Sequence, residues 1–305
     1  MKYRSLALLP LIGLLMAVFL TGDSFAQDWD AVEVQATPVG PGIYTLTGRG
    51  GNLAVSIGAN GVFLVDDQYA PLTEKIVTAI RELSDGPIRF VLNTHWHGDH
   101  TGGNENLGGA GALIVAHDNV RRRMSVEQFI EAYDMRVDAS PLGALPVVTF
   151  SEDVTFHLNG DEIHAFHVEH AHTDGDVIVH FQRANVVHMG DVYFSGIYPF
   201  VDVSSGGSVD GIIAASKSVL ERIAEDTQII PGHGTLSGRD GLAEYVAMLE
   251  AVRSRVVELI AAGKSREEVV AAKPTAEFDA EWGGGWIGPD RFVEILYDDL
   301  SRKMP

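Results

Sequence analysis

Three histidines and an aspartate lie within six residues, 95–100, which read His95-Trp96-His97-Gly98-Asp99-His100. The segment directly follows an apolar run, residues 90–92, that is typical of a buried strand. In an extended chain residues i and i+2 project to one side, so His95 and His97 can bind one ion together. Asp99 and His100 lie a turn further on and can serve a second ion. Imidazole and carboxylate ligands suit zinc, so the sequence predicts a metal site at a strand end. The alternative is a surface histidine cluster without metal.

The N-terminus has the layout of a cleavable secretory signal. Lys2 and Arg4 precede an uncharged apolar stretch at residues 6–20, and small residues follow up to Ala26. A membrane span needs roughly 20 apolar residues, and this stretch is shorter and contains Pro10. We therefore predict cleavage after Ala26, a periplasmic or secreted protein, and no stable membrane anchor after cleavage. An uncleaved anchor is the alternative.

Composition limits the classes of partner and chemistry. The chain has 305 residues, no cysteine and a formal net charge of −20. Without cysteine there are no disulfides, thiolate ligands or cysteine nucleophiles. The acidic charge disfavours nucleic acid and anionic lipid, so the predicted partner is a small-molecule substrate. No linker or charge block divides residues 27–305, which we predict to form one domain. Oligomeric state is left unpredicted.

Hydrophobic patterns group the strands into two sets, each followed by helices. This order predicts two mixed sheets packed face to face and covered by helices outside. Two halves of similar order hint at an internal duplication, although no residue-level repeat supports it. Strands are expected at 43–47, 53–57, 62–65, 90–92, 154–158, 163–168, 177–181, 186–189 and 228–230, and helices at 71–83, 209–223, 243–262, 266–272 and 291–301.

Three more candidate ligands follow predicted strands. His172 begins His-Thr-Asp-Gly-Asp, Asp191 follows the strand at 186–189 and a glycine, and His233 stands in Pro-Gly-His-Gly. Strand ends at one edge of a sandwich can converge on a point. The remaining histidines are interpreted as packed or hydrogen-bonded residues, except that His170 is kept as a candidate neighbour of the site, since it lies two positions before His172.

These four motifs, His-x-His-x-Asp-His, His-Thr-x-Gly-Asp, Gly-Asp after a strand and Gly-His-Gly, resemble in order and spacing those of the metallo-β-lactamase superfamily. The resemblance covers essentially all of residues 27–305. It implies an α+β fold, a four-layer αββα sandwich of two mixed β-sheets flanked by helices, with two zinc ions at the edge of the sheets. By motif, His95, His97 and His172 would bind one zinc, and Asp99, His100 and His233 the other. Asp191 would bridge the ions, or lie just outside the ligands if the site follows the lactamase pattern.

The implied activity is hydrolysis by a metal-bound hydroxide, because paired zinc ions lower the pKa of a shared water to about 7. Asp99 would hold the hydroxide and move its proton. We expect a zinc-dependent hydrolase, with two zinc ions per chain, that opens a cyclic amide, and a β-lactam ring is the leading substrate. A lactone, such as an acyl-homoserine lactone, is next, followed by other esters and thioesters.

Departures from the lactamase pattern keep these alternatives open. The Gly-Asp at 190–191 is typical of glyoxalase II and lactonase relatives, and no lysine stands just downstream of Asp191 to pair with a substrate carboxylate. Export argues against a glutathione thioester. An iron-dependent sulfur dioxygenase is a further alternative, since histidine and aspartate do not choose zinc over iron. A third alternative is a binding protein that merely holds a metal ion and catalyses no reaction.

Aromatic residues near the candidate ligands suggest a substrate pocket. One wall is predicted from Tyr193, Phe194, Tyr198 and Phe200, and the competing interpretation is that these rings only cover the core. Tyr69 is predicted to form a second rim, with Trp96 beneath the site. Trp282 and Trp286 can cover the mouth or cap the C-terminal helix, and capping is favoured.

Overall fold

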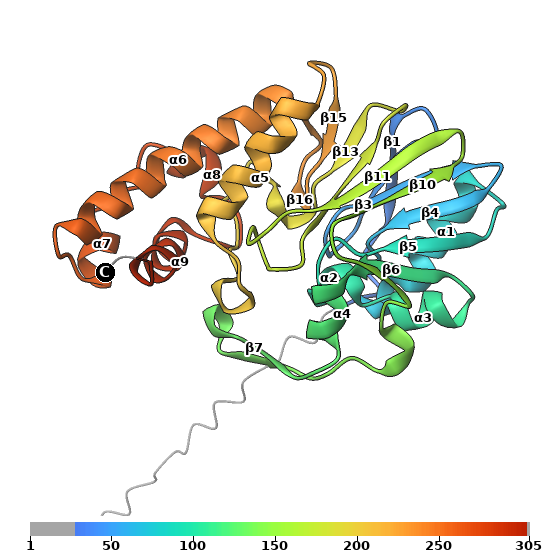
Figure 1. The fold of residues 1–305 in the computed structure, drawn as a ribbon, viewed down its shortest axis with the longest axis horizontal. Helices are drawn as coiled ribbons and strands as arrows, with labels where there is room; N and C mark the ends of the chain where they lie inside the picture. Colours follow the sequence, from blue (N-terminus) through green and yellow to red (C-terminus); the bar gives the residue numbers. More distant parts are fainter. Residues whose placement is uncertain (1–27, 304–305) are drawn as a thin grey trace, which may run out of the picture.

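Two β-sheets packed face to face form the centre of the computed structural model, which describes residues 28–303 (Figure 1). The predicted signal at residues 1–26 lies outside the described residues. The first sheet has the strand order β1-β2-β3-β4-β5-β6-β9, and the second has the order β10-β11-β12-β13-β15-β17. The first comprises β1 (Gln35–Gly40), β2 (Ile43–Thr47), β3 (Leu53–Gly58), β4 (Gly61–Val65), β5 (Ile88–Leu92), β6 (Leu113–His117) and β9 (Val148–Phe150). The second comprises β10 (Asp153–Leu158), β11 (Asp161–His167), β12 (Val177–Phe181), β13 (Val186–His188), β15 (Gln228–Ile230) and β17 (Ser237–Gly238).

Each sheet begins as an antiparallel meander and continues with parallel strands. Strands β1 to β4 pair antiparallel, whereas β4, β5, β6 and β9 pair parallel. In the second sheet β10 to β13 pair antiparallel and β15 joins β13 in parallel. A parallel connection needs a crossover, which α1 (Thr73–Leu83) supplies between β4 and β5 and α5 (Val209–Arg222) supplies between β13 and β15.

Helices cover both outer faces of the sandwich, as Figure 1 shows. Ile76 and Ile80 of α1 pack on Leu64 at the outer face of the first sheet. Helices α5, α6 and α9 pack on the other side around a larger apolar cluster. The remaining helices are α2 (Gly98–Thr101), α3 (Asn104–Gly109), α4 (Asp118–Met124), α6 (Arg239–Ala261), α7 (Arg266–Ala271), α8 (Asp279–Trp282) and α9 (Pro289–Ser301).

The central core lies between the sheets and is built from both. Phe63 of β4 meets Phe156 of β10 at a ring-centroid distance of 4.9 Å and Phe181 of β12 at 6.4 Å. Every residue of β4 is buried, because the sheet is covered on both faces. The predicted αββα sandwich of two mixed sheets is confirmed.

Several elements of this fold were absent from the sequence prediction. Strand β9 has three residues, and an arm is formed by β7 (Gln128–Ile130) and β8 (Met135–Val137) around a 3-10 turn, η2 (Glu131–Tyr133). Strands this short carry too few residues for a period-2 pattern. Strand β6 is buried along most of its length, and a short apolar run of this kind cannot be told from a helix segment by periodicity.

Within residues 28–303, none of the helices combines the length and the apolar character that crossing a membrane requires.

Candidate metal centre

Loops that follow five strands meet at one edge of the two sheets. Asp66 follows β4 directly, and His95 stands three residues after its parallel neighbour β5. Asp191 follows β13 and His233 follows β15, which are also parallel neighbours. Because parallel strands end at the same edge, these side chains are brought together from distant parts of the sequence. His172, beyond the end of β11, joins them.

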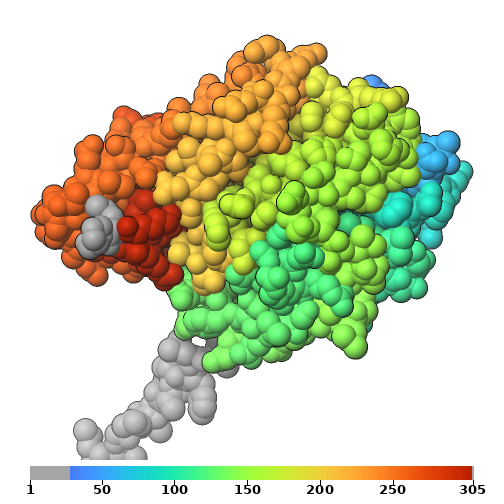
Figure 2. Space-filling view, viewed as in Figure 1, coloured from blue at the N-terminus to red at the C-terminus, as the bar shows by residue number. Residues whose placement is uncertain are grey.

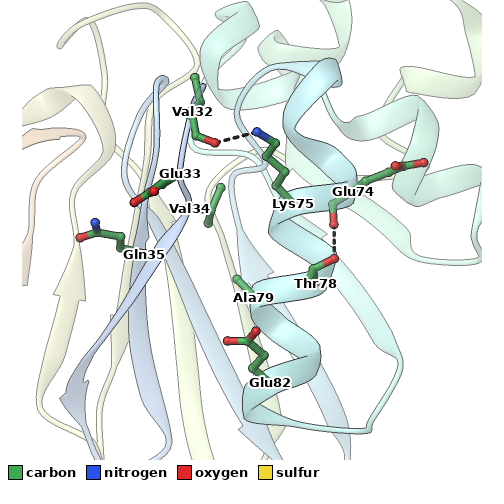
Figure 3. A pocket seen from close by; sticks show the side chains of 9 residues that line it. All are labelled: Val32, Glu33, Val34, Gln35, Glu74, Lys75, Thr78, Ala79 and Glu82. Carbon is green, nitrogen blue, oxygen red and sulfur yellow. Dashed lines mark hydrogen bonds between the residues drawn. The ribbon is translucent and has the colours of Figure 1, made fainter. Parts of the chain in front are cut away.

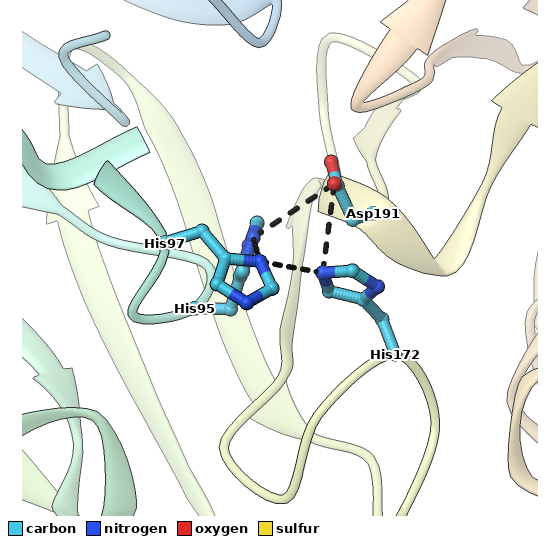
Figure 4. Close-up of side chains that lie close together, drawn as sticks. All are labelled: His95, His97, His172 and Asp191. Carbon is cyan, nitrogen blue, oxygen red and sulfur yellow. Dashed lines mark hydrogen bonds and ion pairs between the residues drawn. The ribbon is translucent and has the colours of Figure 1, made fainter. Parts of the chain in front are cut away.

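Four of the predicted ligands form a first cluster, shown in Figure 4. His97 Nδ1 lies 3.1 Å from His95 Nε2 and 2.9 Å from His172 Nε2. Asp191 Oδ2 lies 3.8 Å from His95 Nε2 and 3.6 Å from His172 Nε2. All four side chains are buried. One donor atom from each residue lies within 4.8 Å of the others, a spacing suited to one ion.

Hydrogen bonds on the outer side of each imidazole fix where its proton sits. His97 Nε2 donates to Asp202 Oδ2 at 3.0 Å, and His172 Nδ1 donates to the Phe200 carbonyl at 2.8 Å. His95 Nδ1 donates to Thr94 Oγ1, which itself donates to a carboxylate oxygen of Asp66. Since the outer nitrogens carry the protons, the three inner nitrogens present lone pairs to one another. Such an arrangement is unfavourable unless a cation lies among them.

Asp99, His100 and His233 form a second cluster beside the first. His233 Nε2 lies 3.3 Å from Asp99 Oδ2, and His100 Nε2 lies 3.7 Å from the same oxygen. Asp191 reaches this cluster too, with its Oδ1 3.1 Å from His100 Nε2 and its Oδ2 3.5 Å from His233 Nε2. Asp191 is therefore in contact with both clusters, and its buried Oδ1 makes no well-formed hydrogen bond.

The two clusters differ in charge. Burial lowers the pKa of His95 and lowers that of His172 to about 4, so both imidazoles are neutral at pH 7. Burial raises the pKa of Asp99, but His100 and His233 outweigh it and hold the value at about 2. The pKa of Asp191 is likewise held low by its imidazoles against the effect of burial.

The carboxylates act in turn on the second cluster. Burial lowers the pKa of His233, yet Asp191 and Asp99 raise it to about 9. The pKa of His100 is raised in the same way, against burial, by Asp191, Asp99 and Asp66. This cluster thus stabilises positive charge, which a metal ion supplies as well as a proton does.

Two glycines allow the backbone to approach the clusters closely. A Cβ on Gly232 would lie 2.1 Å from Asp191 Oδ1, and a Cβ on Gly51 would lie 2.1 Å from His100 Cε1. Neither contact can be relieved without moving a candidate ligand. Lack of space for a side chain therefore explains why residue 232, the first glycine of Pro-Gly-His-Gly, is a glycine. Gly51 likewise lets the loop between β2 and β3 lie directly against the second cluster.

The aromatic residues predicted to line the pocket divide into two groups. Phe194 stacks on His233 and Phe200 stacks on His97, with ring centroids 5.4 Å and 5.9 Å apart. Tyr69 is half-buried, and the carboxylate of Asp99 acts on its phenol, whose pKa is raised to about 12, mainly by burial. These three lie beside the candidate ligands, and Trp96 packs on His97 at 4.7 Å.

Tyr193 and Tyr198 pack into the core, as the competing interpretation expects. Tyr193 is 1% exposed and bonds through its hydroxyl to Ser237 Oγ. Tyr198 is fully buried, stacked on Phe292, with its hydroxyl donating to Asp279 Oδ1. Along an irregular loop the sequence does not show which rings turn toward the site and which turn toward the C-terminal helices.

Trp282 and Trp286 differ in burial and in the residues that they contact. Trp282 is buried against Tyr245 of α6 and belongs to the core. Trp286 is 53% exposed and its ring lies 4.7 Å from that of His233, so it stands at the surface beside the second cluster.

Further functional residues were missed by sequence reasoning. Asp66 could have been predicted from the sequence, because it directly follows a strand that ends at the same sheet edge as the strand before His95. Asp202 could not have been predicted, since its position depends on loop packing. His170 lies apart from the clusters, exposed, with its Nδ1 3.0 Å from the Gly206 carbonyl oxygen.

A groove of about 460 Å³ lies elsewhere, between residues 32–35 and α1 (Figure 3). Its lysine, Lys75, already donates to the carbonyls of Trp29, Asp30 and Val32. None of the nine residues drawn there is a histidine, and the groove offers no comparable donor set.

Comparison with known proteins identifies the family. The model of the metallo-beta-lactamase superfamily matches residues 55–263, which include all seven candidate ligands. The chain belongs to the metallo-β-lactamase superfamily. It is accordingly a metal-dependent hydrolase of that superfamily, and within residues 28–303 the two clusters are the groups of side chains able to hold metal.

Individual members of the superfamily resemble the chain at low identity. It is 26% identical to a hydroxyacylglutathione hydrolase of Polaromonas sp. over 170 residues, 53% of this chain and 55% of that protein. It is 21% identical to a metallo-beta-lactamase type 2 of Bacteroides fragilis over 193 residues, 60% of this chain and 71% of that protein. A metallo-beta-lactamase structure from Pontibacter korlensis superposes with a TM-score of 0.58 at 18% identity, over 72% of this chain and 99% of that one.

The outer partner of His97 leads to a prediction for this superfamily member. Asp202 is 1% exposed, and its other carboxylate oxygen accepts from Ser204 Oγ and the Ser205 amide. Asp202→Asn keeps the shape but removes the charge that orients His97. Loss of such a partner typically costs about 10- to 100-fold in metal affinity. We expect that weakening in a competition titration with a chromophoric chelator.

Asp161→Asn is the matched control, because Asp161 is a buried carboxylate that accepts the Arg183 and Ala184 amides far from the clusters. Its metal affinity should equal that of the wild type. Equal affinity in Asp202→Asn as well would show that Asp202 does not act on the metal site.

Proposed function

We propose that this protein is a zinc-dependent hydrolase, holding two zinc ions per chain, that opens a strained cyclic amide, with a β-lactam ring as the leading substrate. The observation that carries the proposal is the convergence of seven imidazole and carboxylate side chains at one sheet edge, with three lone pairs facing each other. Imidazoles with a few carboxylates and no thiolate form a donor set that suits zinc.

The proposed ligands are His95, His97 and His172 for one ion and Asp99, His100 and His233 for the other, with Asp191 between them. When bound, the ions supply Lewis acidity toward the substrate carbonyl and lower the pKa of water. The protein supplies orientation, through the hydrogen bonds of Asp66, Asp202 and the Phe200 carbonyl to the imidazoles. Asp99 is 22% exposed and ionised at neutral pH, so it can accept a proton at the solvent side.

A cation near the mouth supports an anionic substrate such as a β-lactam. Arg49 is exposed on the loop between β2 and β3, where the neighbouring Gly51 amide donates to the Asp99 carbonyl at 3.1 Å. Its charge lowers the pKa of Tyr69, which places it close to that rim. Within residues 28–303 no ion pair joins Arg49 to an acidic side chain. Arg49 can therefore pair with the carboxylate of the substrate. It would take the place of the lysine that is missing just downstream of Asp191.

A thioester or lactone is the second candidate. One observation favours it, because Asp191 lies against both clusters, as the Gly-Asp pattern of the non-lactamase relatives predicts. A matching relative also bears the name hydroxyacylglutathione hydrolase. Both reactions use the same attack on an activated carbonyl, so the protein's own residues keep their roles.

A substrate panel separates the two. We expect the zinc-loaded protein to hydrolyse a chromogenic cephalosporin and a carbapenem with higher kcat/KM than lactones, thioesters or phosphodiesters. Turnover of only lactones or thioesters would reject the β-lactam proposal and support the second candidate. Stoichiometric iron with oxygen uptake would reject hydrolysis altogether.

A further inference from the structure

Two half-exposed aromatic rings lie near the candidate metal centre, one linked by ring contacts to each cluster. Tyr133, at the tip of the β7–β8 arm, is 44% exposed, and Trp286, in the glycine-rich loop between α8 and α9, is 53% exposed. Rings that only cover a core are buried, as Tyr193 and Tyr198 are. Tyr133 and Trp286 differ from these core rings in that they face solvent while touching rings that contact candidate ligands.

Each of these rings continues a stack that ends on candidate ligands. Tyr133 lies 4.9 Å from Phe200, which lies 5.9 Å from His97. Trp286 lies 5.7 Å from Phe194 and 4.7 Å from His233. Burial raises the pKa of Tyr133, and the Trp286 side chain lowers it. The carboxylates of Asp99 and Asp191 also act on Tyr133.

Both rings are carried by backbone that the fold holds in place. On the arm, Glu131 pairs with Arg302 of the C-terminal segment at 2.7 Å, and Arg291 of α9 donates to the Ala132 carbonyl. In Figure 2 the green atoms of this part of the chain lie directly below the red atoms of the C-terminal helix. Beside Trp286, Ile287 is buried, which fixes the loop while leaving the indole outside.

We infer that Tyr133 and Trp286 form an aromatic mouth that selects substrates whose acyl group carries a flat, apolar substituent. The inference rests on the proposed function, and it names the substrate class within it. An aromatic substituent can stack between or against the two rings while the scissile carbonyl faces the clusters. Trp286 lies beyond residues 55–263, which the superfamily model matches, whereas Tyr133 lies within them.

The test uses two penicillins with the same ring: benzylpenicillin, which carries a phenylacetyl group, and 6-aminopenicillanic acid, which carries none. We expect the wild type to favour benzylpenicillin in kcat/KM. Tyr133→Leu and Trp286→Leu should each lower that preference by about 2- to 10-fold, the range expected for losing one aromatic pair. Phe129→Leu is the control, since Phe129 is equally exposed on the same arm but contacts none of these rings. An unchanged preference in both variants would overturn the inference.

Binding measurements keep this test separate from the proposed function. In the metal-loaded Asp99→Asn variant, calorimetry gives the Kd of each penicillin without turnover. If the wild type opens neither ring, the proposed function fails, and the Kd ratio still decides the inference. If benzylpenicillin binds more tightly than 6-aminopenicillanic acid and this difference is lost with Trp286→Leu, the aromatic mouth is supported. Equal Kd values of the two penicillins for the protein with Tyr133 and Trp286 intact refute it.

Discussion

Asp99→Asn is expected to lower kcat by about 10²- to 10⁴-fold, the usual contribution of a positioned proton acceptor. Asparagine has the same shape but carries no charge and cannot accept the proton at neutral pH. Asp99 can take this role because its side chain is 22% exposed and its Oδ2 lies 3.3 Å from His233 Nε2 at the second cluster, and because its pKa of about 2 leaves it ionised at neutral pH. Steady-state kinetics on the best substrate of the panel measures the effect, with the metal content of the same sample determined in parallel.

Asp153→Asn serves as the control for this substitution. Asp153 lies at the start of β10, half exposed, and its only described ion pair is with His164 at 3.4 Å. Its kcat should match that of the wild type. A kcat for Asp99→Asn within about twofold of the wild type, with metal retained, would remove Asp99 from the reaction.

The candidate ligands could be predicted from the sequence because each lies in a segment that follows a strand with a readable apolar run. His95 and Asp191 stand within a few residues of buried strands, so their place at the sheet edge follows from the strand. Parallel pairing of β4 with β5 and of β13 with β15 then brings the loops together. The same logic predicted both sheets.

The surroundings of the clusters could not be read in this way. Asp202 and Tyr133 lie in loops whose course depends on packing against α9, many residues away in sequence, and Trp286 lies in the glycine-rich loop just before that helix. Tyr193 and Tyr198 flank Phe194 in one short segment, yet they face the core while Phe194 faces His233. Local sequence contains no periodicity from which such turns can be inferred.

Removal of metal is expected to abolish hydrolysis and to lower the thermal stability of the protein. His97 Nδ1 lies 3.1 Å from His95 Nε2 and 2.9 Å from His172 Nε2, and the outer nitrogens of these rings carry the protons. The three inner nitrogens therefore face one another with their lone pairs. A cation relieves that repulsion in the folded state only, so ion binding adds directly to folding free energy. Dialysis against a chelator should therefore reduce both activity and Tm, and zinc should restore both.

Native mass spectrometry during that restoration tests the two-ion centre most directly. The zinc-free protein should gain two zinc ions per chain, and activity should return with them. Asp161→Asn should bind the same number, and the double variant His95→Ala/His172→Ala should bind at most one. A wild-type chain that takes up one zinc or none, or that recovers full activity without metal, would contradict the assignment of these seven side chains as a two-metal hydrolytic centre.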